Sequence, residues 1–265
     1  QQLLQSQKME SLGTLAGGVA HDFNNILSAV IGYTSLIKKQ IDPSTQPGKY
    51  LEAIEKSAQR AASLTRQLLS FSYKTHGEIK PVSVNDLIHD TIHILSSSFP
   101  KKIKIETELS PTNPQILGDQ NLLGQVIMNL CINARDAIMD RGQDAKPGLL
   151  QITTSHFQAG AGFVDLHLSA APGHYVGIMV SDNGVGMAPE LKRRIFEPFF
   201  TTKGKGKGTG LGLSMVYGIV RNHNGFIDVY SEPEIGTSFK IFIPVAEEGE
   251  HVEVHHIEAE LPRGS

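Results

Sequence analysis

Two glycine-rich segments in the second half of the chain have the composition of a site for a charged small molecule. Asp182-Asn-Gly-Val-Gly-Met187 follows an apolar run, and Gly204-Lys-Gly-Lys-Gly-Thr-Gly-Leu-Gly212 precedes a segment with helical spacing. Glycine-rich loops expose backbone N–H groups, lysines add positive charge, and a helix beginning near Leu211 adds a favourable dipole. The two segments together predict a polyphosphate site, although the second alone would also suit a flexible surface loop.

A helix predicted over residues 120–140 carries polar side chains along one face. Steps of four, four and three residues place Gln125, Asn129, Asn133 and Asp136 on that face, with apolar residues opposite. Amides and a carboxylate on an otherwise buried helix need partners, which Mg²⁺ and nucleotide phosphates would supply through oxygen ligands. A solvated polar face is the alternative for this helix alone.

A histidine near the N-terminus stands beside a carboxylate in the sequence His21-Asp22-Phe-Asn-Asn25. Asp22 occupies a position in a seven-residue repeat where an apolar residue is expected, and such a local exception suggests function. A carboxylate that accepts from one ring N–H orients the other ring nitrogen as a nucleophile. A structural role is the alternative for a single helical histidine.

Several classes of protein are excluded by motif and composition. The sequence contains neither GxGxxG nor GxxxxGK[ST], so a dinucleotide-binding fold and a P-loop nucleotide site are both excluded. With 24 Lys+Arg against 27 Asp+Glu, the formal net charge of -3 disfavours dedicated nucleic-acid binding. We find no apolar run long enough for a membrane span and no signal-peptide pattern. One cysteine, Cys131, excludes an intrachain disulfide framework and fits a reducing cytosol.

The elements that must position these residues fall into two regions with different sequence patterns. Residues 1–75 have apolar seven-residue repeats on both sides of one breaker cluster at 42–48, which predicts a helical hairpin that completes a four-helix bundle with a second copy. After a linker at 76–81, residues 82–245 read as blocks of helices and hairpin-linked strands, which favours an α+β fold, an α/β sandwich, over a doubly wound parallel sheet. Residues 246–265 read as a disordered tail that ends in the remnant of a tag.

Within the second region we expect four helices and a set of strands. The expected helices cover 84–97 and 120–140 and begin near 189 and 211; the expected strands cover 103–109, 150–155, 163–169, 175–181, 225–231 and 237–244.

In their order along the chain, these motifs resemble the catalytic core of a bacterial sensor histidine kinase, a phosphoacceptor hairpin followed by an ATP-binding domain of the gyrase, Hsp90, kinase and MutL type. The resemblance covers about residues 8–245. It rests on five segments: Gly13–Asn25 (His box), Asn129–Asp136 (Asn box), Asp182–Met187 (first glycine box), Phe196–Lys203 (Phe box) and Gly208–Leu213 (second glycine box).

The resemblance implies a role for each residue of the hairpin motif. His21 would attack the γ-phosphate of ATP and become phosphohistidine, while Asp22 would orient it and act as general base. The spacing His-Asp-x-x-Asn resembles the branch in which an amide, here Asn25, positions water to dephosphorylate the partner regulator. The proline that many members carry after the acceptor is absent here. We therefore expect a bifunctional kinase and phosphatase.

The resemblance also implies a nucleotide site. Asn129 would ligate Mg²⁺ and Asn133 would contact phosphates, while Asp182, supported by Thr237, would accept from the adenine amine. Gly184 and Gly186 would let adenine approach the backbone. The other expected nucleotide contacts are Asp136, Lys203, Gly208, Thr209, Gly210, Leu211 and Gly212, while Phe196, Phe199 and Phe200 would pack the lid. Arg135 is left open between a phosphate contact and a salt bridge.

The expected cofactors are ATP and Mg²⁺, and the expected partners are a second copy of the chain and the receiver domain of a response regulator. We expect contact with neither nucleic acid nor membrane. The implied location is the bacterial cytoplasm, and an anchor through a sensor outside this sequence is left open. Two alternatives remain: a catalytically silent ATP-binding scaffold, and a clamp-type ATPase, which would leave His21 unexplained.

Overall fold

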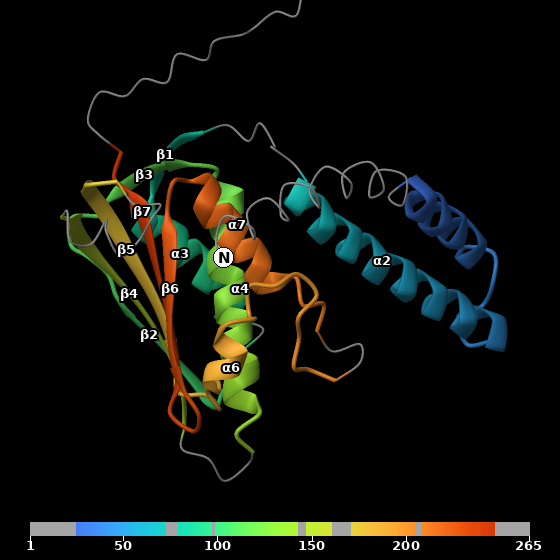
Figure 1. The fold of residues 1–265 in the computed structure, drawn as a ribbon. Coiled ribbons are helices and arrows are strands. Elements are labelled where there is room, and N and C mark those ends of the chain that lie inside the picture. Colours follow the sequence, from blue (N-terminus) through green and yellow to red (C-terminus); the bar gives the residue numbers. More distant parts are fainter. Residues whose placement is uncertain are drawn as a thin grey trace, which may run out of the picture.

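The first part of the computed structural model is a helical hairpin. The structure describes residues 25–72, 79–96, 99–142, 147–160, 171–204 and 208–246. A helix over residues 25–38 and α2 (Gln46–Ser72) run antiparallel (Figure 1), and an ion pair of 2.7 Å between Lys38 and Glu55 links them. In the turn, Asp42 Oδ1 accepts hydrogen bonds from the Ser44 amide and hydroxyl, each at 2.8 Å. The predicted acceptor pair, His21 and Asp22, lies outside the described residues.

The second part is a sheet covered on one face by helices. Its five strands are β2 (Ile103–Glu108), β4 (Gly148–Ala159), β5 (Gly173–Asp182), β6 (Phe226–Glu232) and β7 (Gly236–Pro244), in the order β2-β4-β5-β7-β6. Only the pairing of β2 with β4 is parallel. The covering helices are α3 (Val84–Ser96), α4 (Gln120–Met139) and α7 (Gly212–Asn222), as Figure 1 shows.

Three smaller elements complete this part. A short helix, α6 (Pro189–Lys192), follows β5, with proline at its start, where a missing N–H costs nothing. Strands β1 (Lys80–Ser83) and β3 (Gln115–Gly118) pair with each other, and a bridge from Ile116 to Val245 ties them to the end of β7.

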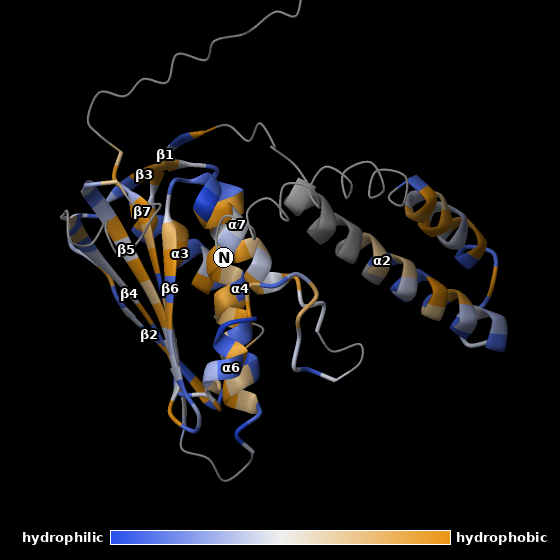
Figure 2. Cartoon of the chain, viewed as in Figure 1, coloured by the Kyte–Doolittle hydropathy of each residue, from blue (hydrophilic) through white to orange (hydrophobic). Residues whose placement is uncertain are grey.

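Alternation along the strands creates the core. Every second residue of β4, β5 and β7 faces the helices and is buried, as Leu150, Ile152, Val176, Ile178 and Ile241 illustrate. The helices return apolar stripes with helical spacing to this surface, which Figure 2 shows as orange bands on α4 and on the strands. The polar face of α4 is thereby turned to the side, where it meets the loops that follow β5 and precede α7.

The α+β expectation is confirmed, with differences in detail. β1 and β3 were not expected, because four-residue strands carry too little periodicity to be recognised. β1 begins at Lys80, inside the expected linker, so the folded part starts two residues before the predicted boundary of 82. The expected strand at 163–169 lies in 161–170, outside the described residues. In the part of the chain that the structure describes, no helix is long and apolar enough to span a bilayer.

A buried histidine joins the two helices that frame the site. His223 follows α7, and its Nδ1 lies 2.7 Å from the Ile219 carbonyl oxygen, while its Nε2 accepts from the Asp119 amide at 3.1 Å. The ring is therefore neutral, with its proton on Nδ1. Asp119 in turn caps α4 by accepting from the amides of Asn121 and Leu122. The side chain fixes the end of α7 against the start of α4.

Removing this imidazole should weaken the domain. We expect His223→Ala to lower the free energy of unfolding by about 2–3 kcal/mol, because it leaves the buried Asp119 amide unpaired and opens a cavity. The measurement is urea unfolding followed by circular dichroism. The control is His174→Ala, at an exposed histidine on β5, where a change within about 0.5 kcal/mol is expected. Equal effects of the two substitutions would contradict the bridging role of His223.

Candidate nucleotide site

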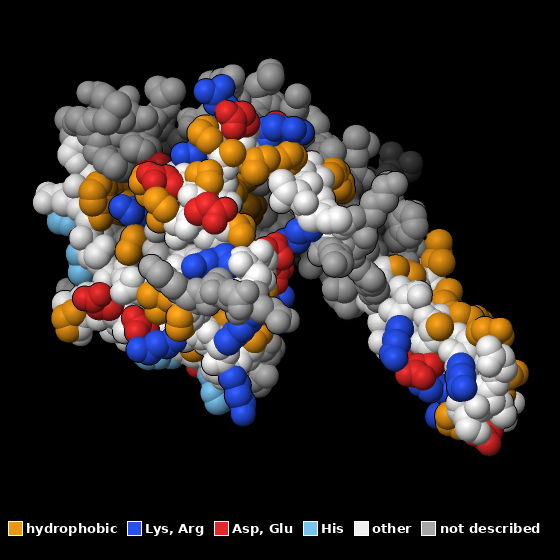
Figure 3. Space-filling model, turned by 90° about the horizontal axis from the view of Figure 1, so that it is seen from below, with side chains coloured by type: hydrophobic (Ala, Val, Ile, Leu, Met, Phe, Trp, Pro, Cys, Tyr) orange, Lys and Arg blue, Asp and Glu red, His pale blue; other side chains and the backbone are white. Residues whose placement is uncertain are grey.

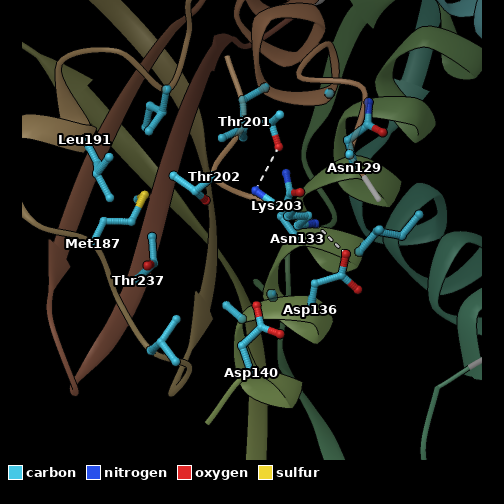
Figure 4. A pocket seen from close by; sticks show the side chains of 18 of the residues that line it. Asn129, Asn133, Asp136, Asp140, Met187, Leu191, Thr201, Thr202, Lys203 and Thr237 are labelled. Atoms are coloured by element: carbon cyan, nitrogen blue, oxygen red, sulfur yellow. Dashed lines mark hydrogen bonds and ion pairs between the residues drawn. The ribbon is translucent and has the colours of Figure 1, made fainter. Parts of the chain in front are cut away.

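A cavity of about 440 Å³ lies between α4 and the loops at the edge of the helical layer (Figure 4). Its walls come from α4, from the end of β5 and the glycine loop after it, from α6, from residues 200–203 and 208–210, from the start of α7 and from β7. Polar side chains gather along the α4 wall and apolar ones, including Met187 and Leu191, on the other (Figure 4). A pocket with one polar and one apolar wall suits a ligand with a flat apolar part and a charged part.

Asp182, the last residue of β5, defines one end of the cavity. Its Oδ1 accepts a hydrogen bond from the Gly184 amide at 2.7 Å. The carboxylate also accepts from the amide of Thr237, the residue of β7 that pairs with Asp182. Burial raises the pKa of Asp182 to about 6, although these two backbone hydrogen bonds lower it. Thr237 is itself buried, and its hydroxyl lies 2.8 Å from that of Ser231. A buried carboxylate with lone pairs to spare fits an exocyclic amine.

The loop after Asp182 requires glycine because it packs closely against its neighbours. Gly186 has φ +66°, and a Cβ there would lie 1.8 Å from the Glu232 carbonyl oxygen. A Cβ on Gly184 would come within 2.6 Å of that of Ala137 on α4. Steric closeness to β6 and α4 therefore accounts for both glycines in this structure.

The other end of the cavity lies where α4 meets the N-terminus of α7. A Cβ built on Gly212 would lie 3.9 Å from Asn129 Oδ1 and 4.0 Å from Asn133 Nδ2, so both amides face the first turn of α7. Leu211 stands at the N-cap and its side chain offers no cap, while Thr209 Oγ1 accepts from the Leu211 amide at 3.2 Å. Free N–H groups and the helix dipole make this end attractive to an anion.

Asn129 supplies the test of whether a metal and phosphates fit here. Among the described residues, its Nδ2 is the buried side-chain nitrogen without a hydrogen-bond partner. A buried unpaired amide costs about 1–3 kcal/mol unless a ligand satisfies it. An amide whose oxygen ligates Mg²⁺ and whose nitrogen donates to a phosphate would be fully paired, so these residues fit the group.

We call the segment from Phe196 to Gly210 the lid; the structure describes its residues 196–204 and 208–210, and these two parts meet at a strained point. Phe199 has φ +64° and Gly210 has φ +67°, and a Cβ on Gly210 would lie 2.3 Å from the Phe199 carbonyl carbon. Phe196 packs against Tyr217 at 5.4 Å, and Phe200 lies under the Arg194 guanidinium at 4.3 Å, whereas Phe199 is exposed. Phe196 and Phe200 thus hold the start of the lid against the domain, and Gly210 packs closely against Phe199 at the other end of the lid.

Three charged side chains pair at the phosphate end. Lys203 Nζ lies 2.5 Å from Asp136 Oδ2, and Arg135 donates to Asp136 Oδ1 from Nη2 at 2.7 Å and from Nε at 3.0 Å. For Arg135, left open between two roles, the structure shows the salt bridge. Each oxygen of Asp136 therefore accepts from a cationic side chain in this arrangement.

The structure brings most of the predicted nucleotide residues to this one cavity. They are Asn129, Asn133, Asp136, Asp182, Gly186, Lys203, Gly208, Thr209, Gly210, Gly212 and Thr237. Gly184 and Leu211 lie beside it and act through their backbone. Asn25 is on the hairpin, exposed to solvent.

Sequence reasoning missed the apolar wall formed by Leu191 and Ile195, together with Thr201, Thr202 and Asp140. Nothing in their spacing marks them as ligand contacts.

This sheet, with a buried aspartate at one end of the cavity and paired asparagines at a helix N-terminus at the other, defines an ATP-binding domain. The model for "Histidine kinase-, DNA gyrase B-, and HSP90-like ATPase" matches residues 118–247, and that for "His Kinase A (phospho-acceptor) domain" matches residues 11–77. The chain therefore belongs to the histidine kinase family and comprises its catalytic core.

Individual relatives agree. The chain is 41% identical over 244 residues to Sensor kinase CckA of Brucella abortus (strain 2308), a match that covers 92% of this chain and 25% of that protein. Full-length ShkA in complex with AMPPNP is similar in structure, with a TM-score of 0.69 and 26% identity over 88% of this chain and 46% of that one. Histidine kinase ThkA in complex with response regulator protein TrrA shares the fold, with a TM-score of 0.56 and 24% identity over 91% and 64% of the two chains. The chain thus spans a quarter to a half of these first two relatives.

Proposed function

We propose that this chain catalyses ATP-dependent phosphorylation of its own His21 and passes the phosphoryl group to an aspartate of a response-regulator receiver domain. The observation that carries the proposal is the two-ended cavity, with Asp182 at one end and the unpaired Asn129 amide, facing the start of α7, at the other. The hairpin match at residues 11–77 includes His21, which supports His21 as the acceptor in this proposal. Relatives named as a sensor kinase and as a sensor histidine kinase support the same interpretation.

Different residues bind the base, the phosphates and the metal ion of the nucleotide. Asp182 accepts a hydrogen bond from the adenine amine, and the apolar wall with Met187 and Leu191 covers the base. Asn133, Lys203 and the free N–H groups of α7 hold phosphate oxygens. Asn129 would hold Mg²⁺ through its amide oxygen, and a bound Mg²⁺ supplies charge neutralisation at the phosphates.

The acceptor supplies the nucleophile. A ring nitrogen of His21 bonds to the γ-phosphorus as the bond from that phosphorus to the β,γ-bridging oxygen breaks, and ADP leaves. Asp22 orients the ring through the other nitrogen and takes up its proton. Alignment and charge neutralisation dominate the rate of phosphoryl transfer, so the two parts of the chain must meet.

A second copy of the chain completes the hairpin in this proposal. Ile26, Tyr33, Leu36 and Ile54 carry the seven-residue repeats, and each is between 48% and 69% exposed. Apolar side chains lie along the projecting hairpin in Figure 3, and such a face needs a partner. Two hairpins would bury it as a four-helix bundle. A response regulator as the further partner is supported by the kinase–regulator complex with the same fold.

The test is incubation of the chain with Mg²⁺ and ATP labelled at the γ-phosphate. We expect label on the protein that is stable in base and labile in acid, and that moves to a receiver domain when one is added. ATP turnover with no label on the protein would overturn the proposal in favour of a clamp-type ATPase. ATP binding with neither turnover nor label would favour a scaffold.

Phosphatase activity toward the regulator belongs to the same proposal and depends on Asn25. We expect Asn25→Ala to slow dephosphorylation of a phosphorylated receiver domain by about tenfold or more, because the amide no longer orients the attacking water. Autophosphorylation should stay within about twofold of the wild type, since the amide takes no part in that step. The measurement is loss of label from a receiver domain that the wild-type chain phosphorylates. Ser28→Ala, one turn along the same exposed helix surface, is the control. Undiminished phosphatase activity in the Asn25 variant would sink this assignment.

A further inference from the structure

The charged cluster at the phosphate end joins α4 to the lid. Lys203 and Asp136 are 67 residues apart in sequence, and their ion pair, marked in Figure 4, links these two walls through their side chains. Both side chains are partly buried, with 30% and 27% exposure, so water screens the pair less than a surface salt bridge. The cluster is therefore placed to fix where the lid cation sits.

The charges of the cluster resolve an apparent conflict. A carboxylate beside a polyphosphate would repel it, yet two cations surround this one and leave a net charge of +1. Burial tends to raise the pKa of Asp136, but hydrogen bonds from Lys203 and Arg135 lower it below its ordinary value, so the group stays ionised. Asp136 accordingly suits holding a cation better than contacting a phosphate itself.

The side chains of Arg135 and Lys203 differ in how many of their N–H donors remain available to a ligand. Arg135 uses Nε and Nη2 on Asp136 and lies over the Phe99 ring at 5.9 Å, which holds it against the protein. Lys203 has three N–H donors, of which Asp136 takes one. An ordered ammonium with donors to spare loses less conformational freedom when it binds a phosphate than an unrestrained lysine would.

We propose that Asp136 is a positioning residue: it holds the Lys203 ammonium at the phosphate end of the cavity, where Lys203 binds the terminal phosphate of a nucleoside triphosphate. The pair thereby makes the site prefer a triphosphate to a diphosphate. This inference rests on the proposed nucleotide site. It adds the pair of residues, Asp136 and Lys203, that distinguishes a triphosphate from a diphosphate. It replaces the expectation that Asp136 contacts the nucleotide directly.

The test compares dissociation constants for AMPPNP and ADP, each with Mg²⁺, by titration calorimetry on the whole chain. We expect D136N and K203M each to weaken AMPPNP binding by about tenfold, the effect of one charge-assisted hydrogen bond, and to change ADP binding by less than about threefold. The double variant should bind no more weakly than K203M alone, because Asp136 acts through Lys203. D90N removes an exposed carboxylate on α3 and should change neither constant.

A conservative variant separates positioning from a structural role. K203R should keep part of the triphosphate preference in the wild-type background and lose it when combined with D136N. Equal weakening of AMPPNP and ADP by D136N would overturn the inference, since a structural defect acts on both ligands, and so would unchanged binding of both. If the wild-type chain bound neither nucleotide, the proposed function itself would fail instead.

Discussion

Replacing His21 with alanine is expected to lower acid-labile label on the protein to below about 1% of the wild type, because no other group replaces a lost nucleophile. The measurement is the labelling reaction with Mg²⁺ and γ-labelled ATP, followed by acid and base treatment of the denatured protein. ATP affinity should be unchanged, since among the residues that the structure describes none of those lining the cavity comes from the hairpin. The prediction thus separates phosphorylation from nucleotide binding.

A control histidine makes this result specific. The sequence contains 11 histidines, and His93→Ala, at an exposed position on α3, should label like the wild type. Asp22→Asn should retain the acceptor but label about 100-fold or more slowly, because the ring loses the group that orients it and takes its proton. Label that persists at full level in the His21 variant would place the acceptor elsewhere.

What could be predicted from the sequence depends on how local the signal is. Asn129, Asn133 and Asp136 share a helix, so spacing alone placed them on one face, and that face does line the cavity. The glycine loop after Asp182 was likewise found because strand, carboxylate and glycines are adjacent in the chain. The alternating burial of β4, β5 and β7 follows from period-two patterning in the same way.

Features that depend on tertiary contact were out of reach. The pairing of Lys203 with Asp136 joins residues far apart in sequence, and only the path of the lid decides that they meet. His223 gave no signal of its link to Asp119, because its two partners lie on different helices. β1 and β3 are too short to carry a pattern, and their pairing is stabilised by contact with the end of β7.

Asp182→Asn is expected to weaken ATP binding by about 100-fold, because the site loses a charged acceptor and gains a misplaced donor. The Asp182 carboxylate accepts from the amides of Gly184 and Thr237 and has further lone pairs for the adenine amine. An asparagine has one acceptor oxygen, so in either orientation its NH₂ group faces another N–H donor. Calorimetry with ATP measures the loss, and D90N is the matched control for removal of one negative charge.

The dependence on pH gives an independent check on the same residue. Burial raises the pKa of Asp182 to about 6, and protonation would take up a lone pair that the ionised carboxylate offers to the amine, so wild-type affinity should fall as the pH drops through 6. Folding stability should respond in the opposite sense. A raised pKa in the folded state means that this group stabilises the nucleotide-free protein at low pH, and that the contribution is lost as the pH rises through 6. The Asp182→Asn variant should lose both the change in nucleotide affinity and the change in folding stability that this group produces around pH 6. Wild-type affinity that stays constant between pH 5 and pH 8 would rule out an ionised Asp182 as the acceptor of the adenine amine.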